Sequence, residues 1–109
     1  MAEAEWMALE GIDPKTAQFP ARARLGEEGI VIFRSPRGFF GTQRTCPHQQ
    51  ASLMQAVLQA NGTMIRCSRH HYTFRAADGR PVNCPGFRLQ VYEVKETDGR
   101  LLARPTPVA

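Results

Sequence analysis

Two short pairs of metal-ligating residues lie near the middle of this chain of 109 residues, Cys46-Pro47-His48 and Cys67-Ser68-Arg69-His70. Each pair combines one thiolate with one imidazole, and 18 residues separate His48 from Cys67. Two sulfur and two nitrogen ligands spaced as C-x-H and C-x2-H can hold a binuclear iron–sulfur centre, with both cysteines on one iron and both histidines on the other. The pattern therefore predicts Cys46, His48, Cys67 and His70 as metal ligands.

Spacing alone leaves other interpretations open. Structural zinc sites also use two sulfurs and two nitrogens, but their ligands are commonly spaced C-x2-4-C and H-x3-5-H. Each pair in this chain instead mixes one cysteine with one histidine, which favours the iron–sulfur centre. A site that has lost its metal is a third alternative. His71 adjoins His70 and would give C-x3-H if it replaced that residue as the ligand.

Short strands and turns are expected to position these ligands, as in a small β protein. We expect strands at 5–9, 21–25, 29–34, 39–43, 57–60, 63–66, 88–95 and 101–104. Asn61-Gly62 predicts a two-residue type I′ hairpin loop that delivers Cys67 at the end of a strand. The gap between the ligand pairs can then hold one hairpin, so the four ligands converge from two neighbouring loops. Residues 51–60 have the propensity for a helical turn or two, and 105–109 are expected to fray.

From about Thr45 to the C-terminus the chain resembles the Rieske [2Fe-2S] family. Besides the four ligands, Leu53 matches an apolar residue that packs beside the ligand loops in that family, and Phe74 matches an aromatic residue four after the second histidine. Pro85-Gly86 more loosely matches a proline-containing loop that covers the third side of the cluster.

The resemblance implies an all-β fold, a Rieske-like antiparallel sheet sandwich with a small two-loop cluster-binding subdomain. It implies a single Rieske [2Fe-2S] domain over residues 1–109, with the cluster-binding subdomain at about 44–87, and one [2Fe-2S] cluster per chain. In the family the imidazole edges of the ligands face solvent while the thiolates are buried.

Three residues near the loops are not predicted to be ligands. Gln50 and His71 stand where many family members have glycine. Cys84 is the third cysteine of the chain and is expected to be an ordinary thiol. With two of three cysteines assigned to the metal, a secreted disulfide framework is not expected.

Departures from the respiratory-chain members of the family predict a low reduction potential. Those members carry an extra cysteine pair that bridges the two loops, and the matching positions here are Ala51 and Arg69. They also place serine and tyrosine hydroxyls on the cluster sulfurs, where this chain has Tyr72 and Phe74. Loss of hydrogen-bond donors lowers the potential within the Rieske range of about −150 to +300 mV.

Basic residues are concentrated near the predicted metal centre. Arginine supplies 12 of the 14 basic residues, and 34–88 contains eight arginines but one acid, Asp78. Six of the ten acids lie in residues 1–28. Arg66, Arg69 and Arg75 could therefore steer an acidic partner, or could simply be solvated surface residues. Nucleic acid is not expected as a partner, because no recognition motif accompanies the charge.

The resemblance implies a Rieske ferredoxin that carries single electrons from a flavin-dependent reductase to a terminal oxygenase of the ring-hydroxylating type. Such a protein is an electron-transfer component of a multicomponent oxidoreductase rather than an enzyme. An alternative is a Rieske-like small subunit of a larger oxidoreductase such as assimilatory nitrite reductase, which the stretch 70–74 also resembles. A third is a metal-stabilised interaction module without redox function.

Length and hydropathy predict a single cytoplasmic domain. No apolar run approaches the ~20 residues of a membrane-spanning helix, so no membrane partner is expected. Residues 1–10 are acidic, unlike a signal peptide. No catalytic triad or phosphate-binding loop is present.

Overall fold

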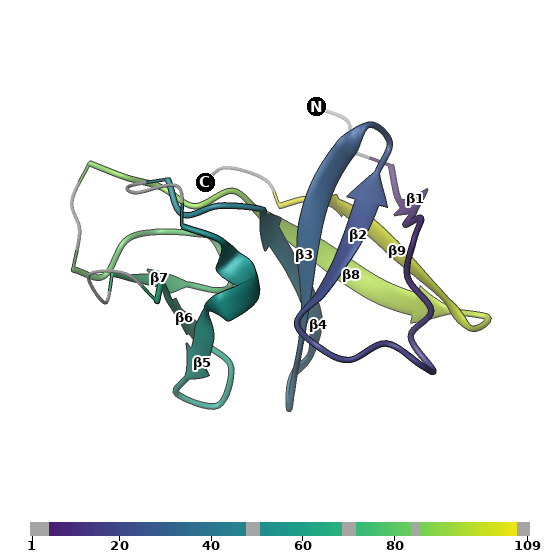
Figure 1. The fold of residues 1–109 in the computed structure, drawn as a ribbon, viewed down its shortest axis with the longest axis horizontal. Helices are drawn as coiled ribbons and strands as arrows, with labels where there is room; N and C mark the ends of the chain where they lie inside the picture. Colours follow the sequence, from purple (N-terminus) through teal and green to yellow (C-terminus); the bar gives the residue numbers. More distant parts are fainter. Residues whose placement is uncertain (1–4, 48–50, 69–71, 84–85, 107–109) are drawn as a thin grey trace.

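Two antiparallel sheets make up the fold in the computed structural model, which describes residues 5–47, 51–68, 72–83 and 86–106 (Figure 1). The larger sheet has the order β1-β9-β8-β4-β3-β2 and the smaller has the order β5-β6-β7. The elements are β1 (Met7–Ala8), β2 (Ala21–Leu25), β3 (Glu28–Ser35), β4 (Gly38–Gln43), the 3-10 helix η1 (Leu53–Gln55), β5 (Val57–Gln59), β6 (Met64–Arg66), β7 (Thr73–Arg75), β8 (Val91–Thr97) and β9 (Arg100–Pro105). The predicted all-β fold is confirmed.

The larger sheet closes on itself. β1 pairs with β9, and Glu10, just beyond β1, forms a bridge to Arg24 of the opposite edge strand β2. The N–H of each of these two residues donates to the carbonyl of the other at 2.9 Å. Closure satisfies edge groups that would otherwise be open for pairing with another chain.

β3 is buried on both faces because its alternate side chains contribute to two different cores. Ile30 and Ile32 pack inside the larger sheet, whereas Val31 and Phe33 pack toward the smaller sheet. Successive side chains of a strand point to opposite faces, so one strand can join two cores. The core inside the larger sheet consists of Leu9, Ala23, Ile30, Ile32, Tyr92, Leu101 and Ala103.

The second core lies between the larger sheet and the cluster-binding region. Its buried members are Val31, Phe33, Cys46, Leu53, Ile65, Cys67, Phe74, Leu89 and Val91. Leu53 from η1 and Phe74 from β7 are both fully buried there, as the resemblance implied for Leu53. Both predicted cysteine ligands therefore belong to one apolar core.

The β5–β6 turn has the left-handed backbone expected at Asn61-Gly62, but the connection contains four residues instead of the predicted two, because the ladder ends at Gln59 and Met64. Asn61 and Gly62 have φ of 57° and 83°, and the Thr63 N–H donates to the Ala60 carbonyl at 3.2 Å. Ala60 also has a positive φ of 53°, so the strands end one residue earlier than predicted. A side chain at Gly62 would overlap Ser35, which shows that this turn packs directly against the β3–β4 turn.

Several predicted boundaries were wrong. β7 was not predicted at all, and the expected helical turns at 51–60 are reduced to the single turn η1. Residues 88–90 do not extend β8, because the Leu89 N–H donates to the Gly79 carbonyl at 2.9 Å. Pro105 is not frayed: it ends β9 opposite Tyr92. Among the described residues, no helix is long and apolar enough to cross a membrane.

Candidate metal centre

The first ligand loop is closed at its base by backbone pairing. Thr45 forms a bridge with Ser52, and the Cys46 N–H donates to the Ala51 carbonyl at 2.8 Å. The Ser52 hydroxyl accepts a hydrogen bond from the Met54 N–H at 3.2 Å and caps η1. Cys46 is therefore held at the first position of a short loop whose two ends are paired.

The second ligand loop repeats this arrangement. The Cys67 N–H donates to the Tyr72 carbonyl at 2.7 Å, and the flanking residues Arg66 and Thr73 pair as part of the β6–β7 ladder. In both loops the cysteine N–H binds the carbonyl five residues further on. Two loops of equal length thus present their cysteines in equivalent positions, which sequence spacing alone did not reveal because the ligand pairs differ, C-x-H against C-x2-H.

Both cysteines are buried in the same core, with side-chain surroundings that favour a metal. Their exposed fractions are 0% for Cys46 and 1% for Cys67, and neither forms a disulfide within the described residues. Both sulfur atoms lie in the same apolar core, so a metal bound to them would be shielded from water. Soft sulfur donors in a dry site suit zinc or an iron–sulfur cluster.

The remaining predicted ligands, His48 and His70, lie outside the described residues, so their roles stay predictions. Gln50, Arg69, His71, Cys84 and Pro85 also lie outside them.

A third loop, residues 81–87, follows β7 and is tied to it by residues that the sequence analysis did not single out. The Asn83 Oδ1 atom accepts a hydrogen bond from the Thr73 N–H at 2.9 Å, and the Val82 N–H donates to the Thr73 carbonyl at 2.8 Å. Thr73 is the first residue of β7, directly after the second ligand loop. The cluster of turn-forming residues around Asn83 was the only sequence signal for this attachment.

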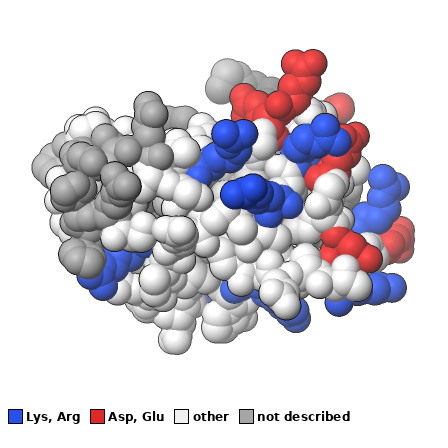
Figure 2. Space-filling model, viewed as in Figure 1, with Lys and Arg blue, Asp and Glu red and all other residues white. Residues whose placement is uncertain are grey.

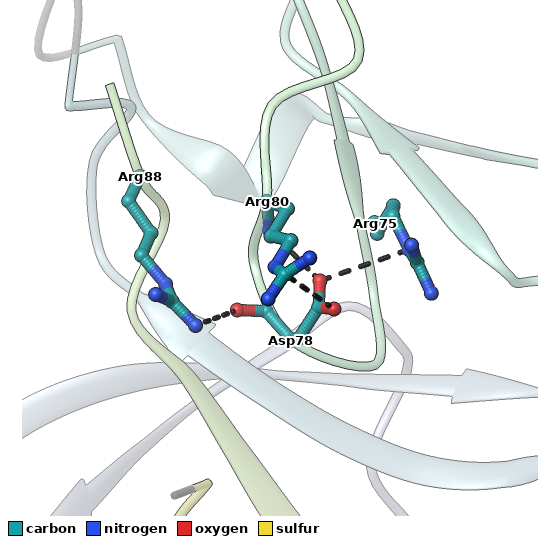
Figure 3. Close-up of polar contacts among 4 residues, drawn as sticks. All are labelled: Arg75, Asp78, Arg80 and Arg88. Atoms are coloured by element: carbon teal, nitrogen blue, oxygen red, sulfur yellow. Dashed lines mark hydrogen bonds and ion pairs between the residues drawn. The ribbon is translucent and has the colours of Figure 1, made fainter. Parts of the chain in front are cut away.

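Asp78 closes the base of the third loop (Figure 3). Its Oδ1 accepts a hydrogen bond from the Arg80 N–H at 3.0 Å, and its carbonyl accepts one from the Arg88 guanidinium at 3.2 Å. The carboxylate also lies 3.7 Å from the Nε atoms of both Arg75 and Arg80. Since Arg80 and Arg88 flank residues 81–87, the one acid of the basic stretch joins the two ends of this loop.

Three of the positions on which the low-potential prediction rests are among the described residues. Phe74 is fully buried and has no hydroxyl, and the half-buried Ala51 and Tyr72 pack against the same core. No cysteine stands at Ala51 to form an inter-loop bridge.

One cysteine loop lies between β4 and η1 and the other between β6 and β7, and the two meet in the core between the sheets of a small all-β domain. The model of the family described as the Rieske [2Fe-2S] domain matches residues 5–93, and the chain belongs to that family. A family of this kind implies a [2Fe-2S] cluster, with which the two buried thiolates are compatible.

Similar proteins of known role are ferredoxin components of oxygenase systems. The ferredoxin CarAc of Metapseudomonas resinovorans is 32% identical over 79 residues, covering 72% of each chain. The ferredoxin subunit of anthranilate 1,2-dioxygenase from Burkholderia cepacia is 27% identical over 99 residues, covering 90% of each chain. The ferredoxin component of the alkene monooxygenase system of Xanthobacter autotrophicus is 29% identical and covers 77% of this chain and 68% of its own length.

Solved structures are also similar to this chain in fold. The complex of reduced oxygenase and oxidised ferredoxin in carbazole 1,9a-dioxygenase contains a chain with a TM-score of 0.68 and 27% identity, covering 90% of this chain and 91% of that one. A protein described as a nitrite reductase small subunit has a TM-score of 0.76, but its 16% identity shows the fold alone. The predictions of a Rieske fold and an oxygenase-type ferredoxin are confirmed.

Proposed function

We propose that this chain carries single electrons from a flavin-dependent reductase to a terminal oxygenase of the ring-hydroxylating type. The observation that carries the proposal is the pair of equal loops that hold Cys46 and Cys67 in one core. The ferredoxin relatives support it, since one of them aligns over 90% of both chains. The reductase and the oxygenase are proposed as transient protein partners.

We further propose that Cys46 and Cys67 bind one iron of a single [2Fe-2S] cluster and that His48 and His70 bind the other. The bound cluster supplies one-electron oxidation and reduction. The chain's own contribution is to hold the two thiolates and to exclude water, because Leu53, Ile65 and Phe74 are fully buried around them. The cysteine N–H bonds to the carbonyls that close each loop keep the sulfur ligands in place.

The domain limits belong to the same proposal. One Rieske domain would span 1–109, with the cluster-binding subdomain at about 44–87; η1, β5, β6 and β7 all lie within the latter range. The cytoplasmic location stays a prediction.

Cluster type is tested first, and carrier activity is tested second. Visible absorption and EPR of the purified protein should give the signature of a His-ligated [2Fe-2S] cluster, and metal and acid-labile sulfide analysis should give about two irons and two sulfides per chain. Stopped-flow mixing of the reduced protein with a ring-hydroxylating oxygenase should then show one-electron reoxidation. A colourless protein that contains one zinc and no sulfide would refute the proposal.

A second candidate function is a small subunit of a nitrite reductase, favoured only by the fold similarity at a TM-score of 0.76. Stable co-purification with a large catalytic subunit, instead of transient binding, would select this alternative.

A further inference from the structure

A basic groove lies between η1 and the edge strand β2 of the larger sheet. We call it the arginine groove: it is lined by Arg22, Arg24, Arg44, Thr45 and Ser52 over a floor that includes Val31 and Met54. Its volume is about 430 Å³. Both η1 and β2 face the reader in Figure 1, and Figure 2 shows basic side chains at the centre of the same view.

The charge of the arginine groove is left partly unbalanced. Its described lining residues include three arginines and no acid. Arg24 is paired with Glu10 at 3.0 Å, but the side chains of Arg22 and Arg44 make no hydrogen bond or ion pair with any other described residue. Neighbouring cations repel one another, and an oxyanion between them relieves that repulsion. Guanidinium groups bind carboxylates with paired, well-directed hydrogen bonds.

Gly29 makes room for this arrangement. A Cβ atom at Gly29 would lie 2.7 Å from the Arg44 Cδ atom, so any larger residue would push the Arg44 side chain away. Gly29 pairs with Arg24 and Val31 pairs with Arg22 in the β2–β3 ladder, which places these residues on the face that also carries the cluster-binding region. The groove is therefore formed by the larger sheet together with the base of the first ligand loop and η1.

Strand geometry indicates what kind of ligand fits. Arg22 and Arg24 are two residues apart on β2, which corresponds to about 6.6 Å, the same spacing as alternate side chains of any extended peptide. Glu10 of this chain shows how an acidic residue can bind along β2. Its backbone pairs with that of Arg24 on the side of β2 away from β3, and its carboxylate binds the Arg24 guanidinium. Arg22, the next position along this edge, has no such carboxylate among the described residues.

We propose that the arginine groove binds an extended acidic segment of a partner protein, with carboxylates on Arg22 and Arg44. The inference rests on the proposed function in that it supplies a docking site for a protein partner. Thr45 and Ser52, the bridged pair that closes the Cys46 loop, also line the groove. A segment bound there contacts the base of the first ligand loop.

Peptide binding to the holoprotein tests the inference. The probe is a short fluorescein-labelled peptide that alternates Glu and Thr, with a Gln-Thr peptide as its uncharged match, followed by fluorescence anisotropy at fixed ionic strength. The double variant Arg22→Gln/Arg44→Gln should weaken binding of the acidic peptide about tenfold, or ~1.4 kcal/mol. The matched control Arg37→Gln/Arg100→Gln removes the same charge from exposed positions outside the groove and should change the affinity less than about threefold.

The outcomes separate this inference from its alternatives. Equal weakening in both double variants would mean diffuse attraction and would overturn it, as would equal affinity for the Gln-Thr peptide. Inorganic phosphate that binds as tightly as the acidic peptide would identify a free-oxyanion site instead, and would likewise overturn the assignment to a protein segment. The cluster spectrum and its one-electron reduction, recorded on the same variants, test the proposed function independently of peptide binding.

Discussion

Cys46 and Cys67 are the residues on which the proposed centre depends, because each is buried where a thiolate without a cation is costly. Their loops are closed by the same backbone hydrogen bond, whereas Cys84 lies outside the described residues. Ligand roles can therefore be tested by comparing substitutions at predicted ligands with one at Cys84.

Replacing His48 or His70 by Ala should abolish the native cluster, since each change removes one of only two nitrogen ligands to an iron. Cys84→Ser should leave about two irons and two sulfides per chain, because this thiol is not a predicted ligand. Iron, sulfide and visible absorption are measured after purification. If all three variants lose the cluster equally, the ligand assignment is wrong.

A hydroxyl beside the cysteine sulfurs should raise the reduction potential. Phe74 is fully buried in the core that holds Cys46 and Cys67, so Phe74→Tyr introduces a donor close to both loops. We expect the wild-type midpoint in the lower half of the Rieske range of about −150 to +300 mV, and a higher value in the variant.

Protein-film voltammetry measures both midpoints, with Phe39→Tyr, a half-buried site in the other core, as the matched control. A wild-type midpoint above about +100 mV would contradict the low-potential prediction. An unchanged midpoint in a Phe74→Tyr protein whose structure shows the hydroxyl on a cysteine sulfur would refute the hydrogen-bond explanation.

At the scale of elements, β7 joins the second ligand loop to the third loop. Its first residue, Thr73, is hydrogen-bonded by Val82 and by the Asn83 side chain, and Asp78 closes the base of the third loop. The three-residue strand thus depends on side-chain contacts as well as on its ladder to β6.

Asn83→Ala should loosen the third loop, since it removes the acceptor of the buried Thr73 N–H at a cost of about 1–3 kcal/mol. Asn83→Asp keeps the Oδ1 acceptor and should behave like the wild type. The measurement is the rate at which an iron chelator bleaches the visible absorption, together with the urea midpoint. Equal rates for wild type and Asn83→Ala would show that this tether does not protect the centre.

Tyr92 links β8 to the start of β3 and should give the fold an alkaline pH dependence. Its hydroxyl donates to the Glu28 Oε2 atom at 3.0 Å, and burial, followed by this hydrogen bond and the carboxylate charge, raises the pKa of Tyr92 from 10.0 to about 12. As pH rises, Tyr92 loses its proton at a lower pH in the unfolded chain than in the folded protein. The stabilisation that Tyr92 contributes is therefore complete below pH 10 and is lost as pH rises toward 12.

Urea unfolding at a series of pH values tests this expectation. Tyr92→Phe should lower the free energy of unfolding at neutral pH by about 1 kcal/mol and should flatten its decline between pH 10 and 12. A decline of equal slope in both proteins would assign the alkaline effect to other groups.

At the scale of the whole molecule, acidic side chains are concentrated on the larger of the two sheet layers. Acidic side chains gather over the six-stranded sheet in Figure 2, and none of the described side chains visible at the opposite end is acidic. Asp78 partly neutralises Arg75 and Arg80, so Arg75 is a weaker candidate for steering than the sequence indicated. Arg66 and Arg69 remain the predicted docking residues beside the second ligand loop.

Electron transfer to an acidic partner should slow as salt rises, because the screening length falls from ~10 Å at 0.1 M to ~3 Å at 1 M. Arg69→Glu should slow it several-fold further at low salt, whereas Arg100→Glu, on the distant β8–β9 turn, should have little effect. Stopped-flow rates are compared across a salt series after confirming that the cluster and its potential are unchanged. If the rates do not depend on salt and are the same in all three proteins, these arginines are ordinary solvated surface residues with no role in docking.

The sequence by itself determined the features that depend on neighbouring residues. The ligand spacing around Cys46 and Cys67 predicted the family, and Asn61-Gly62 predicted a turn whose positive φ values and hydrogen bond the structure contains. Strand-forming residues bounded by turn residues located β2, β3 and β4 to within a residue at each end. Such signals are local because turn chemistry and strand periodicity act over a few residues.

Only the tertiary structure decided how these parts combine. The bridge between Glu10 and Arg24 closes the larger sheet, and the contact between Gly79 and Leu89 delays the start of β8 to Val91, although no local pattern marks either pair. The two cysteine loops, which are separate in the sequence, likewise meet in one core. Long-range pairing depends on which surfaces come into contact when the two cores form. Local patterns in a single sequence do not specify these contacts, so they become visible only in the folded structure.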